Sequence, residues 1–556
     1  MAAMLTSPSL SPEPAGPQPE SDAGVPIAPS VVGVTSNIST LAAGKERNRR
    51  AWLSTLTSSG FGYLMTVISF VVVPLYLKWL GVEAYGRFLT LLAFMGYLNF
   101  ADAGLNWGAL VLIGQAHGRQ DKVAVASLFR HATVLAFGSA IFAIFGALIV
   151  FLLSHAGYRL PMFSEGVAPG WSLLLIGLKS AFMLSTSSVM AMAYGLQEGY
   201  WFARIQGYFQ VVGAALMLVA AFVTRDIDSV VAASAFASGL ACLVTLGLAA
   251  RRYAEYLAIK ISLSRSAFGT QLRIGGKSFL LQGSRLVRTT APLFLVASFA
   301  GSGAVPTLTL PMTLLGVAGG FLFNWSASLQ TAYGEAWAKG DKAWIAASLC
   351  QVLERGLGWL LLVSCLIFSL GQSFVAVWTA GHVVVPTTML LSAVALVISS
   401  WLTDSFIFAL VGINRQRRIA LTELINMGLA IAAGWALCVA GHATYIGFGV
   451  LGAALVSTLW VGRQQLIYWL ATDQFQPRIS AVVRFALATA CALGVLFLAR
   501  LGWRVGASAG LLWLEMAVTG VAGAITFYAS LSVLGMTSEQ WPGFDWRALI
   551  KRRAGC

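Results

Sequence analysis

Residues 131–154 read HATVLAFGSAIFAIFGALIVFLLS, a stretch that contains no Asp, Glu, Lys or Arg. About 20 apolar residues in an α-helix cross the ~30 Å hydrocarbon core of a bilayer, so this stretch predicts a membrane-spanning helix. The whole chain has the same character: 58% of its 556 residues are hydrophobic and 10% are charged. Soluble domains carry about 25% charged residues. The composition therefore excludes a soluble globular protein.

Similar apolar runs recur along nearly the whole chain. They occupy roughly 53–77, 88–114, 131–154, 171–196, 205–224, 229–250, 277–300, 305–330, 346–371, 384–411, 419–440, 443–462, 481–499 and 508–534. Ala, Leu and Gly fill these runs, without the period-2 alternation of a transmembrane β-barrel. We therefore predict an all-α polytopic membrane protein with about fourteen transmembrane helices.

The distribution of Lys and Arg predicts the orientation. With the N-terminus inside, roughly 26 of the 36 Lys and Arg residues fall in inner loops, 6 in outer loops and 4 within apolar runs. Cytoplasmic loops of membrane proteins carry such an excess, so we expect both termini in the cytoplasm. Basic loops against an anionic inner leaflet also explain the net charge of +15. We expect membrane lipids and no nucleic acid as partners.

Composition shifts divide the chain into segments. Residues 1–44 are rich in Pro, Ser, Ala and Gly, which predicts a disordered cytoplasmic tail. A long basic inner connection separates six predicted helices from eight, and an interfacial helix is expected there. The predicted segments are the N-terminal tail 1–50, an N-lobe 51–250, a basic linker 251–276, a C-lobe 277–470, an appended helix pair 471–535 and a C-terminal tail 536–556.

The second apolar run contains three polar residues, Asn99, Asp102 and Asn106, at spacings that place them on one helical face. An ionised Asp102 near the bilayer centre costs about 2.5–3.5 kcal/mol on insertion scales, so it must face a partner or water. Three roles are open: a structural hydrogen bond to a neighbouring helix, proton or cation binding for coupling, or substrate contact.

The seventh run carries a polar stripe. Ser278, Gln282, Arg285 and Thr289 recur at helical spacing, and Arg288 follows Arg285 by three residues. Counted from the start of the run, the two arginines lie roughly 12 and 16 Å deep. Facing lipid, they would cost roughly 5–7 kcal/mol together. A water-filled cavity avoids this cost, and a guanidinium matches phosphate oxygens bidentately. We predict a cationic cavity in which Arg285 and Arg288 bind a diphosphate.

The alternative for these two arginines is a structural one, namely long-range pairing with Asp102 or Asp404. Asp404 in the tenth run and Gln282 are further candidates for lining the cavity or for coupling. Lys179 lies about eight residues into the fourth run from the outer side. Either it reaches the outer surface by snorkelling, or it is a second cavity cation.

Metal, cofactor and enzyme chemistry lack support in the sequence. The six cysteines are scattered without C-x-x-C spacing, which indicates neither a metal site nor a disulfide framework. A lipid-linked glycosyltransferase would need an Asp-rich motif in an outer loop, yet Asp226 and Asp228 are the only close acidic pair there. We expect no metal, no cofactor and no enzymatic activity.

Several motifs resemble those of the Wzx-type polysaccharide flippases. Residues 80–86 read LGVEAYG and residues 99–105 read NFADAGL, similar to the "LG…YG" turn and "D-x-G-L" of that family. The inner loop at 118–122 reads GRQDK, and Glu335 is followed by KGD at 339–341. These too look like the family's loops.

The resemblance covers residues 50–470 in pattern. It implies the multidrug/oligosaccharidyl-lipid/polysaccharide fold, with two six-helix lobes around a central cavity that opens alternately to each side. The implied substrate is an undecaprenyl-diphosphate-linked oligosaccharide, moved to the periplasmic leaflet of a bacterial inner membrane. A polysaccharide polymerase and export proteins are the implied partners, in surface, lipopolysaccharide or exopolysaccharide biosynthesis. The sugar does not carry over.

Two other functions compete with flipping. A multidrug antiporter of the same superfamily would need acids, rather than arginines, in its cavity to hold cationic drugs. A scaffold that transports nothing, with the N-terminal tail as its binding arm in a polysaccharide assembly complex, is the other alternative. Arg285 and Arg288 favour the flippase.

Overall fold

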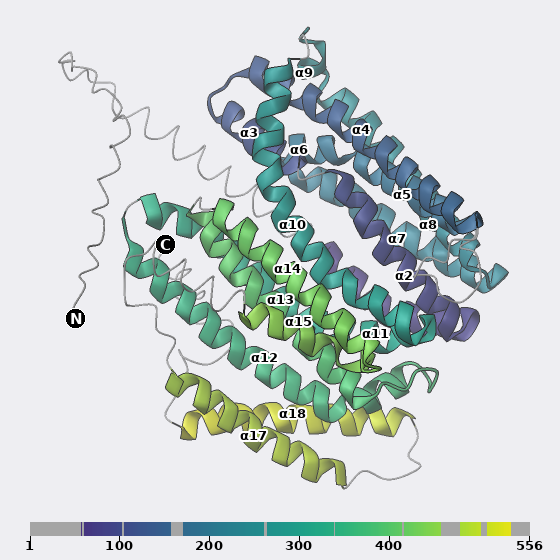
Figure 1. The fold of residues 1–556 in the computed structure, drawn as a ribbon, viewed down its shortest axis with the longest axis vertical. Helices are drawn as coiled ribbons and strands as arrows, with labels where there is room; N and C mark the ends of the chain where they lie inside the picture. The colour runs from purple at the N-terminus through teal and green to yellow at the C-terminus, as the bar shows by residue number, and fades with distance from the viewer. Residues whose placement is uncertain are drawn as a thin grey trace, which may run out of the picture. The chain divides into compact units, whose positions relative to one another are not determined.

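The computed structural model describes residues 57, 60–102, 105–156, 171–260, 264–338, 340–413, 416–456, 479–501 and 509–534. Throughout these ranges the regular structure is helical, with no β-strand (Figure 1). The predicted all-α polytopic fold is confirmed. All described helices belong to the compact unit Arg50–Cys556. The predicted tails, 1–50 and 536–556, lie outside the described ranges.

The helices follow one another along the chain with these bounds: Gly60–Leu80, α2 (Val82–Asn99), η1 (Phe100–Asp102), α3 (Leu105–Gly118), α4 (Lys122–His155), α5 (Ser172–Ser185), α6 (Ser187–Gly195), α7 (Gly199–Thr224), α8 (Ile227–Arg252), α9 (Ala254–Ala258), α10 (Arg265–Ala300), η3 (Ser302–Ala304), α11 (Val305–Ala338), α12 (Lys342–Trp378), α13 (Thr387–Gly412), α14 (Gln416–Val439), η4 (Ala443–Tyr445), α15 (Ile446–Ala454), α17 (Ile479–Leu501) and α18 (Ala509–Val533).

Nine helices in the described part of the chain are long and apolar enough to cross a membrane. The longest are α4 with 34 residues and α12 with 37. At 1.5 Å per residue both exceed the ~30 Å hydrocarbon core, so their ends extend into the interfacial regions. The chain is a multi-pass membrane protein. Each predicted run contains part of a described helix, while the number fourteen stays a prediction.

Several observed helices extend beyond the predicted runs, as α4 and α11 do, and two runs differ in ways that concern the candidate residues. The run 88–114 is divided, because α2 ends at Asn99, η1 follows, and α3 begins only at Leu105. The sequence predicts one helical face for Asn99, Asp102 and Asn106. The structure instead places them on three successive elements, α2, η1 and α3. The seventh run is longer than predicted, since α10 begins at Arg265 rather than at 277.

The LGVEAYG segment has a clear structural role. Gly81 has φ 84° and joins the helix Gly60–Leu80 to α2. A Cβ at Gly86 would lie 1.9 Å from the carbonyl oxygen of Ser302. Only glycine fits this close approach of α2 to η3, because any side chain would overlap the backbone of Ser302.

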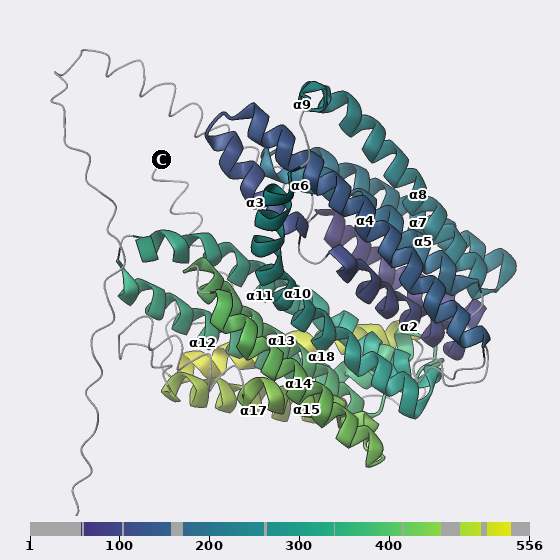
Figure 2. The same ribbon diagram turned by 45° about the horizontal axis from the view of Figure 1, so that its top comes forward.

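The helices pack mainly within two sets, which we call the first helix set (Gly60–Leu80 to α9) and the second helix set (α10 to α15). In the first set, α4 packs on α5, α7 on α8 and α3 on α6. In the second, α11 packs on α13 and α14 on α15. Helix α10 contacts α14 of its own set and also α3 and α2 of the first set (Figures 1 and 2). The pair α17 and α18 packs on α12.

Candidate functional site

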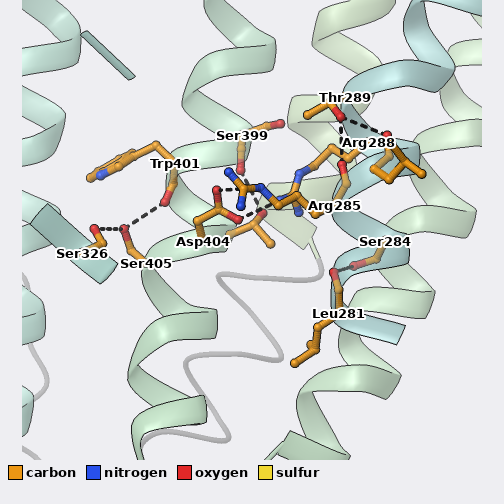
Figure 3. Close-up of polar contacts among 12 residues, drawn as sticks. Leu281, Ser284, Arg285, Arg288, Thr289, Ser326, Ser399, Trp401, Asp404 and Ser405 are labelled. Carbon is orange, nitrogen blue, oxygen red and sulfur yellow. Dashed lines mark hydrogen bonds and ion pairs between the residues drawn. The ribbon is translucent and has the colours of Figure 1, made fainter. Parts of the chain in front are cut away.

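The site lies on α10, which the sequence marks by its two arginines. Arg285 and Arg288 are three residues apart and therefore less than one helical turn apart. Two facing helices of the second helix set each contribute one acidic side chain, Asp404 from α13 and Glu423 from α14. Figure 3 shows Arg285 and Arg288 extending from α10 toward Asp404.

Arg288 is enclosed between the two acids. Its Nη2 lies 3.2 Å from Oδ1 of Asp404, and its Nη1 lies 3.2 Å from Oε2 of Glu423. The Ser284 hydroxyl donates a hydrogen bond of 3.0 Å to the same Glu423 oxygen. The Arg288 side chain is 2% exposed and that of Glu423 3%. One guanidinium thus joins α10, α13 and α14 in a buried network.

Arg285 has a different environment. Its side chain is 46% exposed, and its Nε lies 3.7 Å from Oδ2 of Asp404. This separation permits an ion pair but is too long for a good hydrogen bond. The guanidinium carbon lies 4.1 Å from the centre of the Phe323 ring, a cation–π contact. Arg285 therefore has donors left for an additional anionic group.

The four ionisable groups of this network balance in charge. When Arg285, Arg288, Asp404 and Glu423 are all ionised, they carry two positive and two negative charges. Buried ions are tolerated when each is paired and hydrogen-bonded, whereas removing one partner leaves an uncompensated charge. Because Arg288 is buried and already paired with two carboxylates, Arg285 is the more accessible of the two cations.

The alternative prediction is that the arginines pair with a distant acid. Both arginines do pair with Asp404. Contact of Arg285 and Arg288 with a diphosphate stays a prediction. The structure places Asp102 at the end of η1, half-buried. The backbone of Gln282 belongs to α10, but its side chain is outside the described part of the structure.

Lys179 lies on α5 of the first helix set, away from α10 in the chain. It lines a cavity of about 500 Å³ whose wall is formed by α2, α5, α7, α8, the helix Gly60–Leu80 and Thr313 of α11. Its side chain is half-buried. The structure thus places Lys179 in the wall of a cavity. Its role in coupling stays a prediction.

Glu423 was missed by the sequence reasoning. It lies in the run 419–440, close to its start, and Asn426 follows three residues later. An acid inside an apolar run is the same signal that identified Asp102 and Asp404. Although Glu423 lies close to the start of its run, tertiary packing buries it.

Metal binding has no visible site in the described ranges, since no group of three His, Cys, Asp or Glu side chains is close enough to hold an ion there. Besides the carboxylates of Asp404 and Glu423, this region contains hydroxyl groups. The Ser326 and Ser405 hydroxyl oxygens lie 3.3 Å apart (Figure 3).

Comparison with known proteins gives structural relatives only. No protein-family model and no curated protein matches the chain. Among solved structures, the lipid II flippase MurJ in an inward closed conformation is similar with a TM-score of 0.63 and 12% identity, covering 89% of this chain and 99% of that one.

Two structures of a multidrug resistance MATE family transporter of the MOP superfamily are also similar. The inward-facing one has a TM-score of 0.51 and 18% identity, covering 73% of this chain and 96% of that one. The outward-facing one has a TM-score of 0.52 and 16% identity, covering 76% and 97%. At such identities the similarity establishes the fold alone. Wzx-type membership stays a prediction.

Proposed function

We propose that this protein is a flippase that moves an undecaprenyl-diphosphate-linked oligosaccharide from the cytoplasmic to the periplasmic leaflet of a bacterial inner membrane. The observation that carries the proposal is Arg285, a half-exposed arginine on a helix inside a polytopic membrane protein. The fold shared with a lipid II flippase supports it. The implied pathway is surface or exopolysaccharide biosynthesis.

Arg285 is proposed to make the first contact with the diphosphate. A guanidinium presents a planar fork of donors that matches phosphate oxygens bidentately. The Phe323 ring beneath the guanidinium limits its orientations. A preoriented fork loses less rotamer entropy on binding than a free side chain does. The prenyl tail would remain in lipid, outside the cavity.

Arg288 is proposed to act in two ways. At rest it holds Asp404 and Glu423 and thereby ties α10 to α13 and α14. A diphosphate carrying about two negative charges competes with Asp404 for both guanidinium groups. If Asp404 is displaced, Arg288 can join the diphosphate as the second cation. The same exchange would loosen α10, which contacts both helix sets, and so link binding to alternating access.

The direction of transport follows from charge. With the predicted topology, an inside-negative potential favours outward movement of an anion by about 2.3 kcal/mol per charge per 100 mV. A cavity wall of fixed dipoles and cations replaces the hydration of the diphosphate while it crosses. A coupling ion is therefore not required for this direction, although Asp102 and Asp404 remain candidates for one.

A multidrug antiporter is the second candidate, because two transporters of that kind share the fold. Such a protein would bind a cationic drug through an acid without a partner. Here the acids of the network, Asp404 and Glu423, are both paired with Arg288. The charge of the site thus favours an anionic substrate over a cationic one.

The test is the leaflet accessibility of the lipid-linked oligosaccharide in cells that carry Arg285→Ala together with Arg288→Ala at normal protein level. We expect the lipid-linked units to accumulate on the cytoplasmic side. Arg225→Ala, which changes an exposed arginine at the end of α7, is the matched control and should leave transport unchanged. Arrival of the units in the periplasm at the wild-type rate in the double variant would reject the proposed site.

A further inference from the structure

The cavity beside Lys179 is lined mainly by the first helix set, and Thr313 of α11 contributes to its wall from the second helix set. It has a volume of about 500 Å³, and none of its described lining residues belongs to α10. Pockets of about 300–1,000 Å³ hold drug-sized ligands. The cavity therefore has room for a molecule of its own, at a distance along the chain from the network of Arg288.

Lys179 is the only charged side chain among the described residues that line this cavity. It lies on α5, within the span Ser172–Gly195. No ion pair connects it to any acid in the described ranges. An unpaired ammonium within a membrane span costs about 2.5–3.5 kcal/mol on insertion scales. A ligand that carries a negative charge would offset this cost.

Neutral hydrogen-bonding groups accompany Lys179 on the cavity wall. Gln206 and Gln210 are one turn apart on α7, and Ser234 and Ser238 are one turn apart on α8. The Ser238 hydroxyl already donates to the Ser234 carbonyl, and the Gln206 amide donates to the Thr245 hydroxyl. The exposed Gln210 amide supplies N–H donors to the cavity. Amides and hydroxyls can donate to an oxyanion without adding a competing negative charge. The polar part of the wall thus suits a phosphate or carboxylate group.

The remainder of the wall is apolar. Phe88, Phe182 and Phe209 contribute aromatic rings, and Met65 and Met217 contribute flexible thioether side chains. Methionine adapts its shape to irregular apolar ligands. Such a surface suits a hydrocarbon chain and offers little to a free, fully hydrated anion.

We propose that this cavity binds an amphiphile with an anionic headgroup, whose phosphate or carboxylate contacts Lys179 and whose hydrocarbon chain packs among the aromatic and methionine side chains. This site is independent of the proposed flipping at Arg285. The proposal that the cavity binds an anionic amphiphile does not depend on whether the protein transports a lipid-linked oligosaccharide.

The experiment measures ligand binding to the purified full-length protein by isothermal titration, with decyl phosphate as the probe. Decanol and decyltrimethylammonium serve as neutral and cationic probes of the same chain length. We expect saturable binding of decyl phosphate that is roughly tenfold or more tighter than binding of either other probe, the scale of one charge-assisted hydrogen bond. Equal affinity for the three probes would overturn the proposal.

Variants at Lys179 assign the binding to this cavity. Lys179→Gln should weaken decyl phosphate binding roughly tenfold or more, whereas Lys179→Arg should largely retain it. Lys78→Gln changes an exposed lysine near the end of the helix Gly60–Leu80 and should have no effect. If Lys179→Gln binds decyl phosphate as the wild type does, the proposal fails. Lys179→Met provides a second charge-free variant should the Gln variant not fold.

Competition then distinguishes the sources of the ligand. Displacement of decyl phosphate by phosphatidylglycerol would point to a bilayer lipid as the natural occupant. Displacement by decanoate alone would point to a single-chain acid. Failure of both to displace the probe would contradict a site for anionic amphiphiles.

Discussion

Arg288 and Asp404, which are 116 residues apart in the chain, form a buried ion pair with Nη2 and Oδ1 3.2 Å apart. Glu423 completes the pair on the other side of the guanidinium. Spacing in the sequence does not reveal these contacts, because Arg288, Asp404 and Glu423 lie on three different helices. It divides the two arginines of α10 into an enclosed residue and an accessible one.

Removing Arg288 alone should destabilise the protein strongly. Arg288→Met leaves Asp404 and Glu423 buried without their shared cation, and breaking a buried pair in this way costs about 3–5 kcal/mol. The measurement is the midpoint of thermal unfolding in detergent. The triple variant Arg288→Met, Asp404→Asn, Glu423→Gln removes every buried charge and should recover most of the loss. Equal midpoints for the wild type and the single variant would contradict the network.

Replacing Arg285 should affect transport far more than stability. Its side chain is 46% exposed, so Arg285→Ala should change the free energy of unfolding by about 1 kcal/mol or less. Arg285→Lys keeps the charge but loses the bidentate fork. We expect an intermediate transport rate for the Lys variant and the lowest rate for the Ala variant, measured by leaflet accessibility. Identical rates in Arg285→Lys and wild type would exclude a role for the fork.

Gly86 should not tolerate even a methyl group. Its Cβ would lie 1.9 Å from the Ser302 oxygen, so Gly86→Ala must displace η3 from α2. Overpacking of this kind costs about 1–3 kcal/mol or more. Gly138 on α4 provides the control, because a Cβ added there would have no other atom within 4 Å. Gly138→Ala should leave the unfolding midpoint unchanged or raise it, and similar losses in both variants would contradict the close approach.

The predicted orientation can be checked with single cysteines in a background that lacks the six native ones. Arg225→Cys lies between α7 and α8, and Gln120→Cys lies between α3 and α4. We expect a membrane-impermeant maleimide to label residue 225 from the periplasmic side of intact cells, and residue 120 only after lysis. The reverse pattern would invert the topology.

The sequence predicts the fold class well because lipid imposes one simple constraint. Backbone polar groups must be paired within the span. A long apolar run such as 131–154 therefore forms a helix, which is part of α4 in the structure. Helix limits are harder to predict. The start of α10 at Arg265 lies outside the apolar run, where hydropathy carries no signal. The end of α2 at Asn99 also lies inside an apolar run, where hydropathy gives no signal for it.

The candidate site was predictable in part. Charged residues inside apolar runs are a signal that the sequence carries by itself, and this signal identifies Arg285, Arg288, Asp404 and Lys179. Which of these residues meet is a matter of helix packing across long sequence separations. The pairing of Arg288 with Glu423 could not be read from spacing, because 135 residues separate them. The cavity around Lys179 likewise depends on helices from both helix sets that come together.

The most direct test of the central claim uses the purified protein in proteoliposomes that contain a fluorescent undecaprenyl-diphosphate-linked oligosaccharide. The measurement is the fraction of that lipid that becomes accessible in the opposite leaflet over time. We predict transfer well above that of protein-free liposomes, accelerated by a potential that draws the anion across and reduced at least about tenfold by Arg285→Ala. Transfer no faster than in protein-free liposomes would contradict the account.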